Sequence, residues 1–398
     1  MKTEKCLGRI FRGIFRGIFL GTLLWMWGLV IGSPQISLAA EVQDPDWSDL
    51  QGELDDYDFT SLEQAIQELL PHSGLSFRQI AEQLMAGDMT GFWRGMGQYV
   101  RQMFWGQMVQ GQKVAWQILL LAVAGAIFTN LARAFPDGGV SHSGFFVMYM
   151  VLALLLLTVF SSAVTVAVEA LTAMGQLMTA FLPVFFLVVA VQGQLTAAAM
   201  YECSLLLLRG IQWLYCHVIT AGIRIWVLLR VIEGVFTEEM LTHLTELLGK
   251  GLKSLVKIGF GMAIGFQTIQ ALVFPYLDAV KGGMLVRLAG AIPGVGNSVQ
   301  SAAQMALGTA ALIRNGIGMA GVVILLVFSA GPLIQLCVSG VLYHGLAAVL
   351  QPISDKRVVG AVAAVGDGCL LLMKVLGAGV LLLAVFIGIV CACFGRVN

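Results

Sequence analysis

Long stretches without a charged residue are the feature that most constrains the fold of this chain. The clearest stretch runs from Phe145 to Val168 and contains an unbroken aliphatic run, Leu152 to Leu157. A helix needs about 20 apolar residues to cross the hydrocarbon core of a bilayer. The whole chain is 58% hydrophobic and only 12% charged, whereas soluble domains carry about 25% charged residues. The chain is therefore predicted to be an integral membrane protein.

Apolar segments of this kind recur along the chain and predict an all-α, polytopic membrane protein. We expect six or seven spans after the N-terminal segment, and residues 317–350 form either one tilted span or two helices broken at Gly331 and Pro332. One span is more polar and crosses only if its cations face protein or water. The predicted spans are 114–132, 145–168, 177–191, 205–232 (the polar one), 258–280, 317–350 and 368–394.

Residues 1–40 have the order of features found in secretory signals. A basic start is followed by an apolar core from Gly17 to Gly32 and then by small residues, including Ala39 and Ala40. This order predicts a signal peptide that is cleaved after one of these two alanines. An uncleaved signal anchor is the alternative, because the apolar core approaches the length of a short span. In either case the next segment faces outward.

Residues 41–113 are predicted to form an extracytoplasmic region. Its first part, up to Asp58, is rich in aspartate and poor in branched aliphatic residues, which favours a solvated linker. Capping-box patterns that begin at Thr60 and Ser76 predict two short amphipathic helices. Aromatic rings mixed with cations between Met89 and Lys113 indicate a helix at the membrane surface.

Two segments of the predicted membrane domain, 114–398, are not ordinary spans. Near 237–257, acidic residues come first and lysines last, which suits the helix dipole, and the strong amphipathicity favours an interfacial helix. Near 282–316 the chain is rich in Gly, Ala, Ser and amide side chains. Glycines let backbones approach closely, and irregular backbone at membrane depth must be buried or line water. This second segment is therefore predicted to be re-entrant or pore-lining.

Candidate functional residues come from the glycine-rich segment and from the ionisable residues within the predicted spans. Ionisable residues within spans are costly and often functional. The pairs Asp278 with Lys281 and Asp367 with Lys374 each share a helix face, so each pair could instead neutralise itself in a structural role. The candidate pore or packing positions are Gly290, Pro293, Gly294, Gly296, Asn297, Arg224, Arg230, Asp278, Asp367 and Lys374.

The net charge, the cysteine and histidine positions and the motifs exclude several classes of function. The net charge of zero removes the basic footprint of a nucleic-acid binder. The seven cysteines lie mostly in or beside apolar runs and are interpreted as small buried hydrophobes, with no metal site. His217 and His344 have no carboxylate or cysteine at ligand spacing and are interpreted as structural. Since neither a catalytic triad nor a phosphate-binding loop can be assembled, we expect no enzyme activity and no cofactor.

Two blocks carry a resemblance to a known family. They are the Ala-Ile-Pro-Gly-Val-Gly-Asn block from Ala291 to Asn297 and the Ser-Asp-Lys-Arg block from Ser354 to Arg357. With the signal segment and the small outer region, they resemble the stage III sporulation protein AE family over nearly the whole mature chain. The resemblance implies a multi-pass subunit of the channel or secretion complex between mother cell and forespore, needed for forespore development after engulfment.

The same resemblance implies a place and partners. The chain would lie in the mother-cell membrane that surrounds the forespore, with its N-terminal region outside the cytoplasm. Its partners would be the other stage III sporulation A-operon proteins, including a separate ATPase, and a forespore-side channel protein. The alternative is a self-sufficient secondary transporter of a small solute, because segments interrupted by glycine and proline often build midplane sites.

Overall fold

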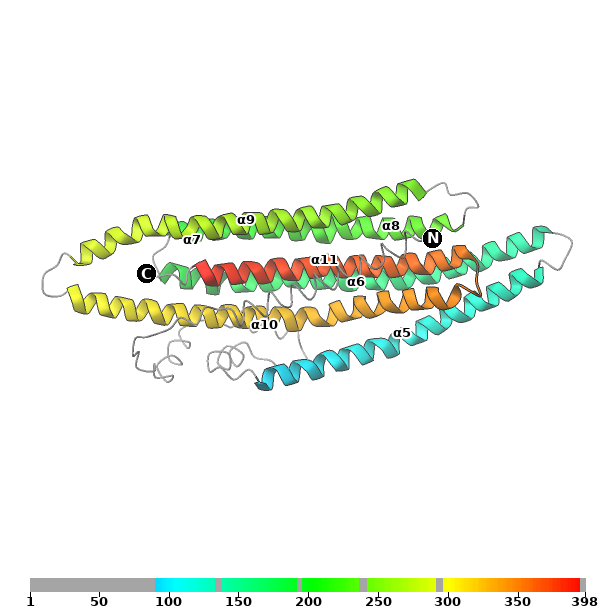
Figure 1. The fold of residues 1–398 in the computed structure, drawn as a ribbon, viewed down its shortest axis with the longest axis horizontal. Helices are drawn as coiled ribbons and strands as arrows, with labels where there is room; N and C mark the ends of the chain where they lie inside the picture. The colour runs from blue at the N-terminus through cyan, green and yellow to red at the C-terminus, as the bar shows by residue number, and fades with distance from the viewer. Residues whose placement is uncertain (1–89, 133–137, 192–194, 236–241, 291–295, 394–398) are drawn as a thin grey trace, which may run out of the picture. The chain divides into compact units, whose positions relative to one another are not determined.

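The computed structural model agrees with the predicted all-α class, because every regular element in the residues that it describes is a helix (Figure 1). The predicted signal peptide at 1–40, the acidic linker and the two short amphipathic helices lie outside the described residues. The structure describes residues 90–132, 138–191, 195–235, 242–290 and 296–393.

Two of the helices, α6 and α10, are much longer than a membrane span. α6 has 54 residues and α10 has 55, which at 1.5 Å per residue is about 80 Å. The hydrocarbon core of a bilayer is only about 30 Å thick, so each of these helices extends well beyond one crossing. The elements are α5 (Thr90–Ala132), α6 (Gly138–Val191), α7 (Leu195–Trp213), the π-helical η1 (Leu214–Ile219), α8 (Thr220–Glu233), α9 (Thr242–Gly290), α10 (Gly296–Leu350) and α11 (Lys356–Cys393).

Several predicted boundaries fall inside continuous helices. α6 contains both 145–168 and 177–191, so the prediction of two separate spans there is wrong. α10 continues through Gly331 and Pro332, so the option of a break at this point is also wrong. The backbone hydrogen bonds of a helix join residues four apart whatever the side chains, and a proline removes only one donor. A change in hydrophobicity therefore does not end a helix.

The segments predicted at the membrane surface also continue into apolar helix. α5 joins the aromatic and basic stretch before Lys113 to the predicted span at 114–132, and α9 joins most of 237–257 to 258–280. α9 continues to Gly290 and α10 begins at Gly296, so helix covers most of the Gly-rich segment that was predicted to be re-entrant.

Four helical segments among the described side chains are long and apolar enough to cross a membrane. These four segments agree with the membrane character that the composition predicts, whereas the predicted count of six or seven spans is not confirmed. The candidate spans are Gly144–Thr179, Cys203–Glu233, Gly318–Leu350 and Lys356–Gly388.

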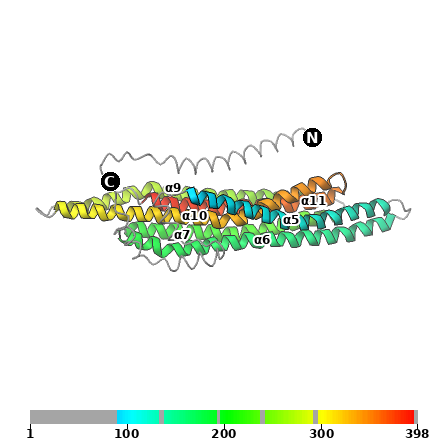
Figure 2. The same ribbon diagram turned by 90° about the horizontal axis from the view of Figure 1, so that it is seen from below.

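α11 is the central helix of the packing. It packs along α10 and also contacts α6, α8 and α9, and Figure 2 shows α10 and α11 running together. Six of its fully buried side chains recur at alternating intervals of four and three residues, so one stripe of the helix lies in the core. Cys369 in this stripe is buried as predicted for the cysteines, whereas Cys203 is exposed. The stripe consists of Val358, Val362, Val365, Cys369, Leu372 and Leu376.

Candidate functional site

Three ionisable side chains from three helices meet inside the candidate spans. They are Arg230 of α8, His344 of α10 and Asp367 of α11, hereafter the charged cluster. Nη2 of Arg230 lies 3.9 Å from Oδ2 of Asp367, and Nε2 of His344 lies 3.4 Å from Oδ1 of Asp367. One carboxylate is thus shared between a guanidinium and an imidazole.

A close approach of α10 and α11 brings His344 to Asp367. A Cβ added to Gly366 would lie 3.1 Å from Cδ2 of His344 and 3.3 Å from the carbonyl oxygen of Gly340. The same addition to Gly340 would lie 3.4 Å from the carbonyl oxygen of Gly366. Small residues at such a crossing let helix backbones pack closely in a membrane protein. The two glycines therefore set the distance across which the imidazole and the carboxylate interact.

Trp226 positions the third member of the cluster. Cζ of Arg230 lies 5.6 Å from the centre of a Trp226 ring, which is within the range of a cation–π interaction. Nε1 of Trp226 donates a hydrogen bond of 2.8 Å to the carbonyl oxygen of Thr245, which lies in α9. The indole of Trp226 thus joins α8 to α9, and its ring lies against the guanidinium of Arg230.

The charged cluster is open on one side. The side chains of Arg230, His344 and Asp367 are 34%, 39% and 45% exposed, so a ligand, a neighbouring protein or water can reach them. An imidazole can both donate and accept a proton, whereas a guanidinium stays charged. Within the described side chains, no group of three His, Cys, Asp or Glu residues lies close enough together to hold a metal ion.

The structure joins some of the predicted charged residues and separates others. Arg230 and Asp367 meet in the cluster, whereas Arg224 lies exposed on α8. Lys374 lies two turns beyond Asp367 on the same half-exposed side of α11. The expected pairing of Asp367 along its own helix overlooked two partners on other helices. The interpretation of His344 as a histidine without a carboxylate partner is wrong, because its partner comes from α11.

The predicted glycine-rich positions lie at the junction of α9 and α10. Gly290 is the last residue of α9, and Gly296 and Asn297 are the first two residues of α10. Pro293 and Gly294 lie outside the described residues, as does the side chain of Asp278, whose backbone belongs to α9. Their role in a pore or in packing stays a prediction.

Hydrogen bonds from buried polar side chains join α9 to α7 and to η1. The hydroxyl of Tyr215 donates to the carbonyl oxygen of Val256 at 3.1 Å, and the hydroxyl of Ser204 donates to the side-chain oxygen of Gln270. Such bonds join helices where lipid offers no alternative partner. Both side-chain polar atoms of Gln267, which is 1% exposed, are buried without a hydrogen-bond partner.

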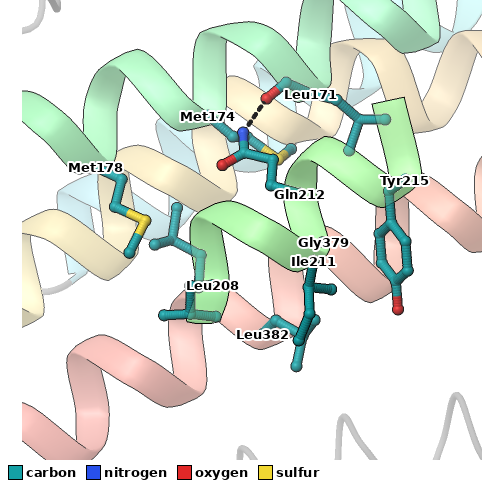
Figure 3. Close-up of a pocket in the computed structure, with 10 residues that line it drawn as sticks. Leu171, Met174, Met178, Leu208, Ile211, Gln212, Tyr215, Gly379 and Leu382 are labelled. Atoms are coloured by element: carbon teal, nitrogen blue, oxygen red, sulfur yellow. Dashed lines mark hydrogen bonds between the residues drawn. The ribbon is translucent and has the colours of Figure 1, made fainter. Parts of the chain in front are cut away.

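A small cavity lies among α6, α7, η1 and α11 (Figure 3). Its wall is largely apolar, and the side-chain amide of Gln212 donates to the carbonyl oxygen of Leu171 at its edge. The volume is about 30 Å³, which is space for about two or three water molecules.

Comparison with known proteins identifies the family. A sequence model of stage III sporulation protein AE matches residues 75–393, a range that includes every described helix and the charged cluster. The chain belongs to the stage III sporulation protein AE family. The predicted resemblance is thus confirmed, and a role in sporulation follows from it.

A curated relative supports membership in the stage III sporulation protein AE family. The protein named Stage III sporulation protein AE from Bacillus subtilis (strain 168) is 25% identical over 259 residues, which cover 64% of each chain. The matched region therefore spans slightly less than two thirds of that relative. No solved structure matches the chain.

Proposed function

We propose that this chain is a membrane subunit of the multiprotein channel or secretion complex that links mother cell and forespore, and that it is needed for forespore development after engulfment. Family membership supports the sporulation role, and four apolar helices support a place in a membrane. The observation that carries the proposal further is the charged cluster, because ion pairs within spans are costly and mark pathways or assembly sites.

The subunit works with partners in this proposal. It lies in the mother-cell membrane around the forespore, with the residues before about 113 outside the cytoplasm and the part of α9 near 237–257 at the membrane surface. It assembles with the other stage III sporulation A-operon proteins and with a forespore-side protein, and a separate ATPase supplies energy. Its own contribution is structural rather than catalytic.

Affinity purification from sporulating cells tests the assembly. A tagged copy that restores sporulation is extracted in mild detergent, and the bound proteins are identified by mass spectrometry. We expect the other channel proteins to be recovered, and we expect deletion of the gene to block forespore development after engulfment. Recovery of this chain alone, together with normal spore yield in the deletion strain, would contradict the proposal.

A substitution in the charged cluster separates function from stability. Asp367→Asn keeps the shape of the side chain but removes its charge. We expect the protein to accumulate normally and spore yield to fall at least tenfold. Glu246→Gln on the exposed side of α9 is the matched control. Equal spore yield for the two variants would remove the cluster from the proposed function.

The alternative of a self-sufficient secondary transporter loses part of its basis. It was motivated by interrupted segments from Gly282 to Gly296 and at Gly331 and Pro332, and α10 is continuous through the second of these. Uptake of a solute by the purified chain in liposomes is the result that would favour it again.

A further inference from the structure

One side of α9 carries a row of charged residues. Glu246, Lys250, Lys253 and Lys257 follow one another at intervals of four, three and four residues, and all four are exposed. This spacing places them on one side of the helix. Nζ of Lys250 lies 3.1 Å from Oε2 of Glu246, whereas Lys253 and Lys257 form no ion pair within the described part of the chain. The row therefore presents two lysines that no described acid pairs.

Two hydrogen bonds fix the direction in which this row points. Nε1 of Trp226 in α8 donates to the carbonyl oxygen of Thr245 at 2.8 Å. The hydroxyl of Tyr215 in η1 donates to the carbonyl oxygen of Val256 at 3.1 Å. The two acceptors lie near the two ends of the row, so α9 cannot rotate about its axis without breaking both bonds. The lysines are thus held on a helix of fixed orientation.

A third lysine comes from α11. α9 packs against α11, and Lys374 of α11 lies within electrostatic range of Lys253 and Lys257. Lys374 is half-exposed and lies inside a candidate span. A charge within a span is costly, and cations at short distance repel one another. These three lysines, hereafter the lysine site, therefore meet where positive charge is expensive.

The acids beside the lysine site do not balance its charge. The nearby carboxylate of Asp367 already contacts Arg230 and His344, and that of Glu246 contacts Lys250. Among the described side chains, the fixed cations of this region therefore exceed its two carboxylates by three. The fixed cations are Arg230, Lys250, Lys253, Lys257 and Lys374.

A phosphate group fits this excess of positive charge. A phosphate monoester carries about 1.5 to 2 negative charges near neutral pH and three acceptor oxygens, whereas a carboxylate carries a single charge. Each lysine ammonium group offers three donors and binds phosphate as a point charge. The adjoining side of α9 is apolar and exposed, which suits the acyl chains of a lipid. It consists of Leu247, Leu255, Ile258 and Met262, which are 70%, 40%, 56% and 57% exposed.

We propose that Lys253, Lys257 and Lys374 bind a phosphate group, carried either by an acidic phospholipid or by a soluble phosphate. The anion replaces the repulsion among the three lysines by attraction to a shared partner, and it connects α9 to α11. A lipid would lay its acyl chains along the exposed apolar side of α9, whereas a soluble phosphate would enter from water. The proposal does not depend on the sporulation role, which assigns no ligand to these lysines.

Thermal unfolding of the purified full-length chain tests the site. The chain is held in a neutral detergent at constant ionic strength, and unfolding is followed by tryptophan fluorescence. One series adds inorganic phosphate in exchange for chloride. The other adds phosphatidylglycerol to the micelles in exchange for phosphatidylcholine. A ligand that binds only the folded chain raises the unfolding temperature as its concentration rises, and we expect such a rise in at least one series.

The two series distinguish the source of the phosphate group. A rise with phosphatidylglycerol alone identifies the ligand as a lipid headgroup, and a rise with inorganic phosphate identifies a site open to soluble phosphates. No rise in either series would show that the lysines are only solvated, and this would overturn the proposal. Since the measurement uses only the purified chain, its failure is distinguishable from failure of the proposed sporulation role.

Substitutions show whether the three lysines hold the ligand. Lys253→Met and Lys374→Met should each weaken binding of the stabilising probe, phosphate or phosphatidylglycerol, at least about tenfold, since each removes a charged donor. Lys374→Arg keeps the charge and should bind the probe more tightly than Lys374→Met. Lys113→Met at an exposed position of α5 is the matched control. Circular dichroism checks that every variant is folded. Unchanged binding by both methionine variants at the site, or equal weakening in the control, would overturn the proposal.

Discussion

Replacement of Gly368 by alanine tests the packing of α11 in the core. A Cβ at this position would lie 2.5 Å from Cγ2 of Val227 and 2.7 Å from Cε2 of Phe160. These two neighbours are 0% and 1% exposed, so neither can move away without displacing others. Overpacking of this kind costs about 1–3 kcal/mol, whereas alanine in place of glycine within a helix contributes about 0.5–1 kcal/mol. The net effect is a loss of up to about 2.5 kcal/mol.

Gly360→Ala on the same helix is the control for this prediction, because nothing lies within 4 Å of the added Cβ. The gain in helix propensity is common to both variants, so their difference isolates the steric cost of about 1–3 kcal/mol. Thermal unfolding followed by tryptophan fluorescence in detergent measures it. We expect the Gly368 variant to unfold several degrees below the Gly360 variant. An equal or higher unfolding temperature would show that α6, α8 and α11 are not packed this closely.

Three further predictions concern α9. Trp226→Phe removes the hydrogen bond of 2.8 Å to the carbonyl oxygen of Thr245 and should cost about 1 kcal/mol in the same unfolding assay; an unchanged stability would contradict that bond. Gln267→Met replaces an amide that is buried without partners and should stabilise the protein by about 1–3 kcal/mol, so a lower unfolding temperature would mean that the amide has a partner. Lys250→Ala should raise the pKa of Glu246, because a hydrogen bond from Lys250 lowers it; NMR titration of the carboxyl checks this. The pair's stabilisation is present above the ordinary pKa of glutamate and is lost as pH falls through the lowered pKa.

The site was only partly visible in the sequence. Arg230 and Asp367 were candidates because any charge within an apolar run is expensive. His344 was missed because its carboxylate partner lies on the next helix, and spacing along the chain does not show which turns of two helices meet. The pair Gly340 and Gly366 was the available signal, since each glycine lies near one member of the ion pair and marks where helices approach.

The sequence by itself determined the helical class, the membrane character, the family and the cost of the intramembrane charges. These properties depend on composition and on patterns within a few turns, which are local. Only the tertiary structure decided that 145–168 and 177–191 form one helix, that α10 does not break at Pro332, and that Asp367 has partners on α8 and α10. A helix continues through a change in hydrophobicity because its backbone hydrogen bonds do not depend on the side chains. Cross-helix distances depend on packing energies summed over many contacts, and no single segment of sequence contains that sum.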